Sequence, residues 1–256
     1  MNRRWKENIR TVLPRSMGDR RILAGPLRGK ILVTSWHDYP AAILGRTERP
    51  LLDWFNRNVG TGETWLDIGA HYGYTAIALC QLVGDAGRVF AFEPMVATAG
   101  CLSRTRTLNR LHQLSVLAMA LDDRDDLAAR SLPQIRGMID SGLQSGGLQE
   151  VFLAGGFDWV WPRIAAGGGP EAMPVHGVKI DVQGMEIKVL RGMRQTLRRF
   201  RPKLAIELHE GVSRQEVLDL LSSVGYPLPG LPIEPLGGET APLYADNRSY
   251  AFLPAA

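Results

Sequence analysis

A short apolar segment followed at once by a glycine-containing turn constrains the fold of this chain more than any other feature. The segment covers residues 65–68, and the turn covers residues 69–73. From Tyr74 onward, apolar residues recur at the spacing of one broad helix face. Strand, turn and helix in this order predict the opening of an α/β sheet that binds its ligand at the turn. Gly69 and Gly73 would let that ligand approach the backbone where a Cβ atom would clash.

Asp67, near the end of the predicted strand, distinguishes between two kinds of ligand. A dinucleotide-binding fingerprint would have its first glycine at this position, and a carboxylate there would repel a pyrophosphate. S-adenosylmethionine (SAM) has no phosphate and carries a cationic sulfonium and a cationic ammonium group, so an acidic residue suits it. We therefore predict a SAM site formed by Asp67, Gly69, Ala70, His71 and Gly73. A NAD-dependent oxidoreductase is the least favoured interpretation.

A second apolar segment, residues 88–92, ends in Glu93 and Pro94. Its distance from the turn is typical of the strand whose terminal acid accepts hydrogen bonds from two ribose hydroxyls; the alternative is an exposed glutamate that begins a loop. Asp122 follows a third predicted strand, residues 114–121, where it could accept from the adenine amine. A simple aspartate-rich turn is the alternative there. Glu93, Pro94 and Asp122 complete the predicted cofactor site.

Strand-like and helix-like segments alternate along the rest of the chain. The expected strands lie at residues 175–184 (with the turn), 203–210 and 248–253, and the expected helices at 48–59, 97–108, 185–200 and 213–224. This alternation predicts a mostly parallel sheet that is covered by helices on both faces. Ligands of such sheets bind beyond the carboxyl ends of the strands. The residues expected to meet there in one site are Asp67, Glu93, Asp122, Asp181, Glu207 and His209.

The chain is expected to form one main domain, residues 51–256, with two decorations. Residues 1–50 form a basic N-terminal extension and a lead-in segment with a predicted hairpin at residues 22–33. The Arg-rich arm could bind nucleic acid, an anionic membrane surface or an acidic partner, or only add solubility. Residues 124–175 are rich in glycine and aromatic residues and are predicted to be a variable insert. Such an insert is often a lid or a loop that determines specificity.

The N-terminal sequence, the length of the apolar runs and the cysteines indicate where in the cell the protein is expected. The start of the sequence lacks the apolar stretch of a signal peptide, and no apolar run reaches the length of a spanning helix. Cys80 and Cys101 fit a reduced, cytoplasmic protein, with Cys80 on the apolar face of the first helix. We therefore predict a cytoplasmic protein without a transmembrane segment.

Three blocks of the sequence resemble the FkbM family of SAM-dependent methyltransferases. They are residues 67–75, residues 87–94 with Asn109, and residues 179–186 with 189–192, 201–202 and 207–209. The resemblance implies an α/β, Rossmann-like class I methyltransferase fold with a mostly parallel seven-stranded sheet and helices on both faces. It also implies an O-methyltransferase that acts on a hydroxyl of a sugar, glycolipid or secondary metabolite. Two positions depart from the family pattern, since His71 stands where Asn is usual and Gln183 where Glu is usual.

Methyl transfer to a hydroxyl requires a group that removes or orients the acceptor proton. Asp181 is the first candidate, either as the base or as the group that orients the hydroxyl, and His209 is the second. Glu207 could orient His209, although two residues that share one face of a strand need not be in direct contact. Asp181, Glu207 and Asp122 also offer oxygen ligands that suit Mg²⁺, but no spacing requires a metal, and none is predicted.

Two other functions compete with this interpretation. A sequence pI near 9.3 and the basic arm favour a nucleic-acid methyltransferase, but the Asp-Val-Gln-Gly turn at residues 181–184 differs from the turn of enzymes that methylate base amines. A non-catalytic scaffold that keeps the fold is the other alternative. The favoured partner is a small-molecule or glycan acceptor; nucleic acid is disfavoured, and a homo-oligomer is compatible with the sequence.

Overall fold

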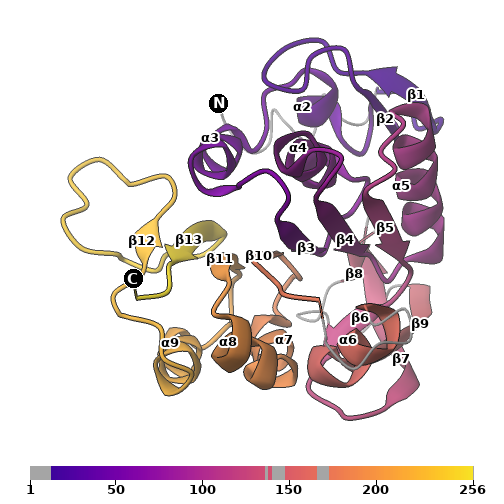
Figure 1. Cartoon of the computed structure of the whole chain (residues 1–256). Coiled ribbons are helices and arrows are strands. Elements are labelled where there is room, and N and C mark those ends of the chain that lie inside the picture. The colour runs from indigo at the N-terminus through magenta and orange to yellow at the C-terminus, as the bar shows by residue number, and fades with distance from the viewer. Residues whose placement is uncertain (1–12, 136–137, 140–147, 166–172, 256) are drawn as a thin grey trace.

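A seven-stranded sheet forms the centre of the protein (Figure 1). The structure is a computed structural model that describes residues 13–135, 138–139, 148–165 and 173–255. From one edge to the other, the strands are β12 (Leu231–Pro232), β13 (Arg248–Phe252), β11 (Lys203–Leu208), β10 (Gly177–Ile180), β3 (Thr64–Ile68), β4 (Arg88–Phe92) and β5 (Leu114–Leu117). The run from β11 to β5 is parallel, and β13 and β12 are antiparallel to their neighbours. The predicted mostly parallel seven-stranded sheet is confirmed.

Helices cover both faces of this sheet, as predicted. One face carries α3 (Arg49–Asn58), α4 (Tyr74–Val83) and α5 (Val96–Leu108), and the other carries α6 (Phe157–Ala165), α7 (Glu186–Gly192), α8 (Arg194–Phe200) and α9 (Arg214–Ser223) (Figure 1). The central strand β3 is buried along its whole length. Its side chains alternate between the faces, so Trp65 packs into one core, whereas Leu66 and Ile68 pack into the other.

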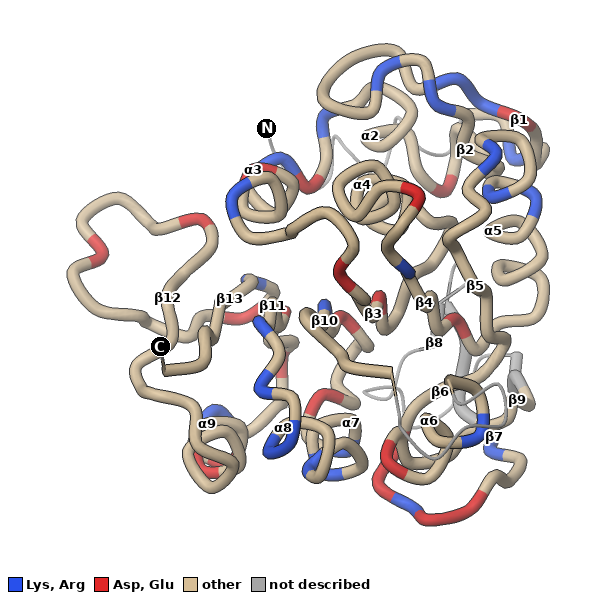
Figure 2. The backbone as a smooth tube through the Cα atoms, in the orientation of Figure 1, with Lys and Arg blue, Asp and Glu red and all other residues tan. Residues whose placement is uncertain are grey.

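The single helix expected at residues 185–200 is divided into α7 and α8. Met193 leaves helical geometry with φ −121° and ψ 19°. The Asp158 carboxylate of α6 accepts hydrogen bonds from the backbone N–H groups of Gln195 and Thr196. It thereby satisfies two of the donors that a new helix start exposes. Lys and Arg residues mark α7 and α8 in Figure 2, and Arg191, Arg194, Arg198 and Arg199 are exposed.

The strand expected at residues 114–121 is also divided. After β5 the chain leaves the central sheet, and β6 (Ala120–Asp122) joins a second sheet with β9 (Leu148–Gly156), β7 (Leu127–Ile135) and β8 (Met138–Ile139). The predicted variable insert therefore contributes β7, β8 and β9 to this four-stranded sheet and also contains α6. A helix and a short edge element were expected within it, but the glycine-rich sequence did not show their positions. Residues 136–137, 140–147 and 166–172 of the insert lie outside the described residues.

The lead-in segment forms the predicted hairpin with a shifted first strand. β1 (Gly18–Arg21) pairs with β2 (Ile31–Thr34), so the first strand ends before Ile22 instead of beginning there. A short helix, α2 (Pro40–Ile43), follows. Residues 1–12 of the basic arm lie outside the described residues. Within the described ranges, no helix is both long and apolar enough to cross a membrane.

Candidate functional site

A cavity of about 280 Å³ opens at the carboxyl ends of β3, β4 and β10. Predicted cofactor residues contribute to its wall at the turn after β3 and at the end of β4; they are Gly69, Ala70, His71, Glu93 and Pro94. The polar–aromatic segment at residues 36–40 also reaches it, through His37, Asp38 and Tyr39. The cavity thus lies where the alternation of strands and helices predicted the site.

Two glycines, Gly69 and Gly73, have different structural roles in the turn after β3. Gly69 has φ +78°, and a Cβ atom on it would lie 1.8 Å from the carbonyl oxygen of Asp181. Only glycine therefore lets the ends of β3 and β10 approach this closely. Gly73, at φ +94°, precedes α4, and a Cβ atom there would lie 2.2 Å from Leu102 of α5. Its absence of a side chain serves helix packing.

Glu93 is the predicted ribose acid, and it lies buried at the cavity wall. Its two carboxylate oxygens accept hydrogen bonds from the backbone N–H groups of His71 and Met95, at 2.9 and 3.0 Å. Burial raises the pKa of Glu93 to about 7, although the two hydrogen bonds act in the opposite direction. The carboxylate ties the glycine turn to β4 and keeps lone pairs for a further donor.

Asp67 lies behind the cavity wall and is fully buried. Its carboxylate accepts from the Thr75 hydroxyl at 2.7 Å and pairs with the Lys179 ammonium at 3.1 Å. Lys179 also donates to the Gly69 carbonyl at 2.8 Å and lies 3.5 Å from Asp181. The sequence predicted direct contact between Asp67 and the cofactor; in the structure, Asp67 instead holds Lys179, which itself lines the cavity.

Asp122 also lies away from the position expected for an adenine ligand. Its carboxylate accepts from the Arg124 backbone N–H at 3.0 Å and pairs with Arg130 at 3.3 Å, within the second sheet. Met119 and Leu121, which precede Asp122 in the chain, form part of an apolar cavity wall instead. That wall consists of Ile68, Phe92, Met119, Leu121 and Phe152.

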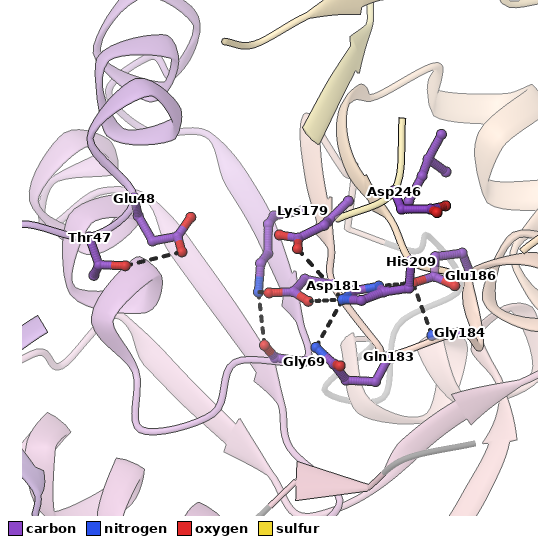
Figure 3. A network of polar contacts seen from close by, with 12 residues as sticks. Thr47, Glu48, Gly69, Lys179, Asp181, Gln183, Gly184, Glu186, His209 and Asp246 are labelled. Carbon is purple, nitrogen blue, oxygen red and sulfur yellow. Dashed lines mark hydrogen bonds and ion pairs between the residues drawn. The ribbon is translucent and has the colours of Figure 1, made fainter. Parts of the chain in front are cut away.

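The three predicted catalytic residues come together at the ends of β10 and β11, and Figure 3 shows His209 beside Asp181. His209 Nε2 lies 3.5 Å from an Asp181 oxygen and 3.6 Å from a Glu207 oxygen. His209 Nδ1 lies 2.6 Å from Oε1 of Glu186, a fully buried residue, and Nε2 lies 2.9 Å from the Gln183 amide nitrogen (Figure 3). Asp181 and Gln183 line the cavity.

Burial and charge shift the proton affinities of this cluster. Burial and the Asp181 carboxylate raise the pKa of Glu207 to about 7. Burial acts to lower the pKa of His209, but the hydrogen bond with Glu186 and the nearby carboxylates raise it above its usual value. Glu207 can therefore exchange a proton near neutral pH.

His71 differs from this cluster in its surroundings. Burial lowers its pKa to about 4, so its ring is neutral near pH 7. The ring packs against Tyr39 and Tyr72, with centroid distances of 5.4 and 4.0 Å. Its Nε2 atom is buried and has no hydrogen-bond partner among the described residues.

Four residues of the site were missed in the sequence, namely Glu48, Lys179, Gln183 and Glu186. Glu48 lines the cavity from the start of α3 with φ +54°. Lys179 carried a usable signal, because a lysine inside the apolar segment 177–180 must find a buried partner. Gln183 was noted only as a departure from a family pattern. Glu186 gave no signal, because an acidic residue in the first turn of a helix is common.

Comparison with known proteins gives one match to a protein family and several matches to solved structures. Residues 168–228 match the family described as methyltransferase FkbM domain, which includes the third predicted block. No curated protein matches the chain. A protein of Clostridium thermocellum, provisionally named an rRNA methylase, has a similar structure with a TM-score of 0.50 at 13% identity, over 80% of this chain and 92% of its own. This similarity shows a shared fold.

Two further structures show weaker similarity. Fibrillarin from Aeropyrum pernix, solved with SAM bound, gives a TM-score of 0.48 at 13% identity, over 77% of this chain and 68% of its own. A methyltransferase FkbM from Methylobacillus flagellatus gives 0.48 at 16% identity, over 78% of this chain and 50% of its own. The chain therefore shares its fold with the Clostridium thermocellum protein, and its residues 168–228 are similar to the methyltransferase FkbM domain.

Proposed function

We propose that this enzyme transfers the methyl group of SAM to a hydroxyl group of a sugar, glycolipid or secondary metabolite. One observation carries the proposal. A cluster of two carboxylates and one imidazole, made by Asp181, Glu207 and His209, adjoins the cofactor cavity at the strand ends. An alcohol is a weak nucleophile at neutral pH, so its methylation benefits from such a cluster, and a general base contributes about 10²–10⁴-fold.

The cavity has the residue types that SAM requires. The apolar wall suits the adenine ring, and Glu93 suits the ribose hydroxyls. The unpartnered Nε2 of His71 offers a position for the methionine carboxylate. Bound SAM supplies a methyl group that is already activated as a sulfonium, so the protein needs only to position the acceptor and manage its proton.

The proton of the acceptor has a defined path among the chain's own residues. Asp181 lines the cavity, and its carboxylate can accept the hydrogen bond of the hydroxyl and fix its direction. Glu207 and His209 lie beside Asp181. Burial raises the pKa of Glu207 to about 7, and the pKa of His209 is raised by Glu186 and the nearby carboxylates against the effect of burial, so the pair can take up the released proton. Glu186 fixes the His209 ring through Nδ1. Asp181 is therefore the orienting residue, and the pair behind it is the proton acceptor.

The test combines a transfer assay with a binding assay. Radiolabelled SAM is incubated with the enzyme and a panel of hydroxylated acceptors, and the SAM dissociation constant is measured by calorimetry. We expect Asp181→Asn and Glu207→Gln to lower kcat by about 10²-fold or more, while SAM affinity stays within about threefold. Asp219→Asn, an acidic change on exposed α9, serves as the control.

Two outcomes would overturn the proposal. Transfer of label to nucleic-acid bases, with none to hydroxylated small molecules, would establish the competing nucleic-acid function. A folded wild-type protein that fails to bind SAM would support a scaffold. Glu93→Ala should abolish SAM binding, and its retention in that variant would refute the ribose role of Glu93.

A further inference from the structure

We propose that Asp181, Glu207 and His209 bind a divalent metal ion at the acceptor side of the cavity. One ligand atom from each residue lies within 4.8 Å of the other two. The three residues come from the ends of two adjacent parallel strands, β10 and β11, so the sheet itself brings them together. The site stands on this geometry, and it does not depend on the identity of the methyl acceptor.

The distances inside the cluster suit a shared ion better than direct contacts. The His209 Nε2 separations of 3.5 Å from Asp181 and 3.6 Å from Glu207 are too long for good hydrogen bonds. Two ligands that hold an ion at about 2.1 Å and at right angles lie about 3 Å apart. Small inward movements of the two carboxylates would therefore bring three ligand atoms to coordination distance from a common centre.

The orientation of His209 is a second, independent observation. Its Nδ1 atom lies 2.6 Å from the carboxylate of Glu186, which is fully buried and also accepts from the Gly184 backbone N–H at 3.2 Å (Figure 3). A proton on Nδ1 leaves the lone pair of Nε2 directed at Asp181 and Glu207. A carboxylate that holds the outer nitrogen of an imidazole in this way is the usual support of a metal-binding histidine.

The charge balance of the region also favours a cation. Four carboxylates, those of Asp67, Asp181, Glu186 and Glu207, lie around this end of the sheet. Lys179 is a buried cation among them, and it already pairs with Asp67 and Asp181. An uncompensated carboxylate in a buried place is costly. A divalent ion at the cluster would offset the remaining negative charge.

The ligand set defines the class of ion. Carboxylate oxygens suit Mg²⁺ and Mn²⁺, whereas imidazole suits transition metals. Three protein ligands leave coordination positions free, and the side of the cluster formed by Asp181 faces the cavity. If the proposed O-methyltransferase function holds, the acceptor hydroxyl would coordinate there and lose its proton more easily.

Gln183 gives the proposal a distinguishing feature. Its amide nitrogen lies 2.9 Å from His209 Nε2, on the side that the ion would approach. Binding therefore requires this side chain to turn aside. Gln183→Ala should bind the ion at least as tightly as the wild type, although it shortens a residue in the same cluster. If the cluster had a purely structural role, neither the wild type nor Gln183→Ala would bind the ion.

The experiment is a titration of the full chain with Mn²⁺ alone. Electron paramagnetic resonance measures the free ion during the titration and the ¹⁴N coupling of the bound ion at its end. We expect one Mn²⁺ per chain, displaced by Mg²⁺, and a ¹⁴N coupling of the bound ion from the imidazole. Glu207→Gln and Asp181→Asn should weaken binding at least tenfold, and His209→Ala should remove the ¹⁴N coupling. Asp219→Asn is the matched control and should bind as the wild type does.

Several results would overturn the metal site. They are the absence of Mn²⁺ binding by folded wild-type protein, unchanged binding in both carboxylate variants, or a bound ion without ¹⁴N coupling. Circular dichroism of each variant confirms that it is folded, and the nearly isosteric Glu207→Gln covers the case in which His209→Ala fails to fold. SAM titration is run in parallel, so protein that binds SAM but not Mn²⁺ refutes the metal site alone.

Discussion

Replacement of Lys179 by methionine is the most informative test of how the site is held together. The ammonium group is 4% exposed and joins three partners from two segments, namely Asp67 at 3.1 Å, Asp181 at 3.5 Å and the Gly69 carbonyl at 2.8 Å. Methionine fills a similar volume without the charge. The variant therefore leaves the carboxylate of Asp67, which is fully buried, without its cation.

The expected magnitude follows from this geometry. Removal of one partner from a buried ion pair costs about 3–5 kcal/mol, because the other charge stays buried and uncompensated. A chain of this size loses about 2–4 °C of melting temperature per kcal/mol. Lys179→Met should therefore lower the melting temperature by about 6–20 °C and should also weaken SAM binding, because the Gly69 turn loses its tether.

A double variant separates the charge effect from the packing effect. In Lys179→Met/Asp67→Asn the buried aspartate charge is removed together with the lysine, so the loss should be smaller than the sum of the two single losses by at least about 1 kcal/mol. Urea denaturation followed by circular dichroism measures all three variants. A Lys179→Met loss below about 1 kcal/mol, or strictly additive losses, would refute the view that this ion pair organises the turn.

Three further changes test other parts of the site. The pKa of Glu93 is raised by burial from 4.5 to about 7, so its stabilising contribution is complete below pH 4.5 and is lost as the pH rises through 7. The free energy of unfolding of the wild type should thus fall by about 3 kcal/mol relative to Glu93→Gln across that window, and parallel pH profiles would contradict the shift. Gly69→Ala places a Cβ atom 1.8 Å from the Asp181 carbonyl oxygen and should cost more than about 2 kcal/mol in thermal unfolding; a near-neutral effect would mean that the turn can move. Phe152→Leu reduces the apolar wall and should weaken SAM binding about tenfold, or about 1.4 kcal/mol, and an unchanged dissociation constant in calorimetry would place adenine elsewhere.

The position of the site could be predicted because strand ends are visible in the sequence. Apolar segments that end in Asp or Glu mark where each strand leaves the sheet, and parallel strands end at one edge. This reasoning placed Glu93, Asp181, Glu207 and His209 correctly relative to the sheet. It could not tell which acid faces the ligand, because that depends on the face to which each strand residue points and on the neighbouring strand.

Asp67 shows this limit in detail. In the parallel register of β3 and β10, Asp67 lies opposite Lys179, so the two side chains share one face and pair. The sequence contains both residues but not the order of the strands, so the acid was expected to meet the cofactor directly. Asp122 fails for another reason, because the apolar run of residues 114–121 does not reveal that the chain changes sheets after Leu117.

The register of β10 and β11 explains why the acceptor side of the site is acidic. Ile180 lies opposite Ile206, so Asp181, the first residue after β10, and Glu207, near the end of β11, lie at the same level. His209, two residues after Glu207, then lies on the same side, and Glu186 at the start of α7 holds its other nitrogen. Two adjacent strand ends thus concentrate negative charge beside the cavity, while Lys179 is directed toward Asp67. A site built in this way must draw in positive charge, whether a proton, the sulfonium of SAM or a metal ion, and its function depends on which of them it holds when the acceptor arrives.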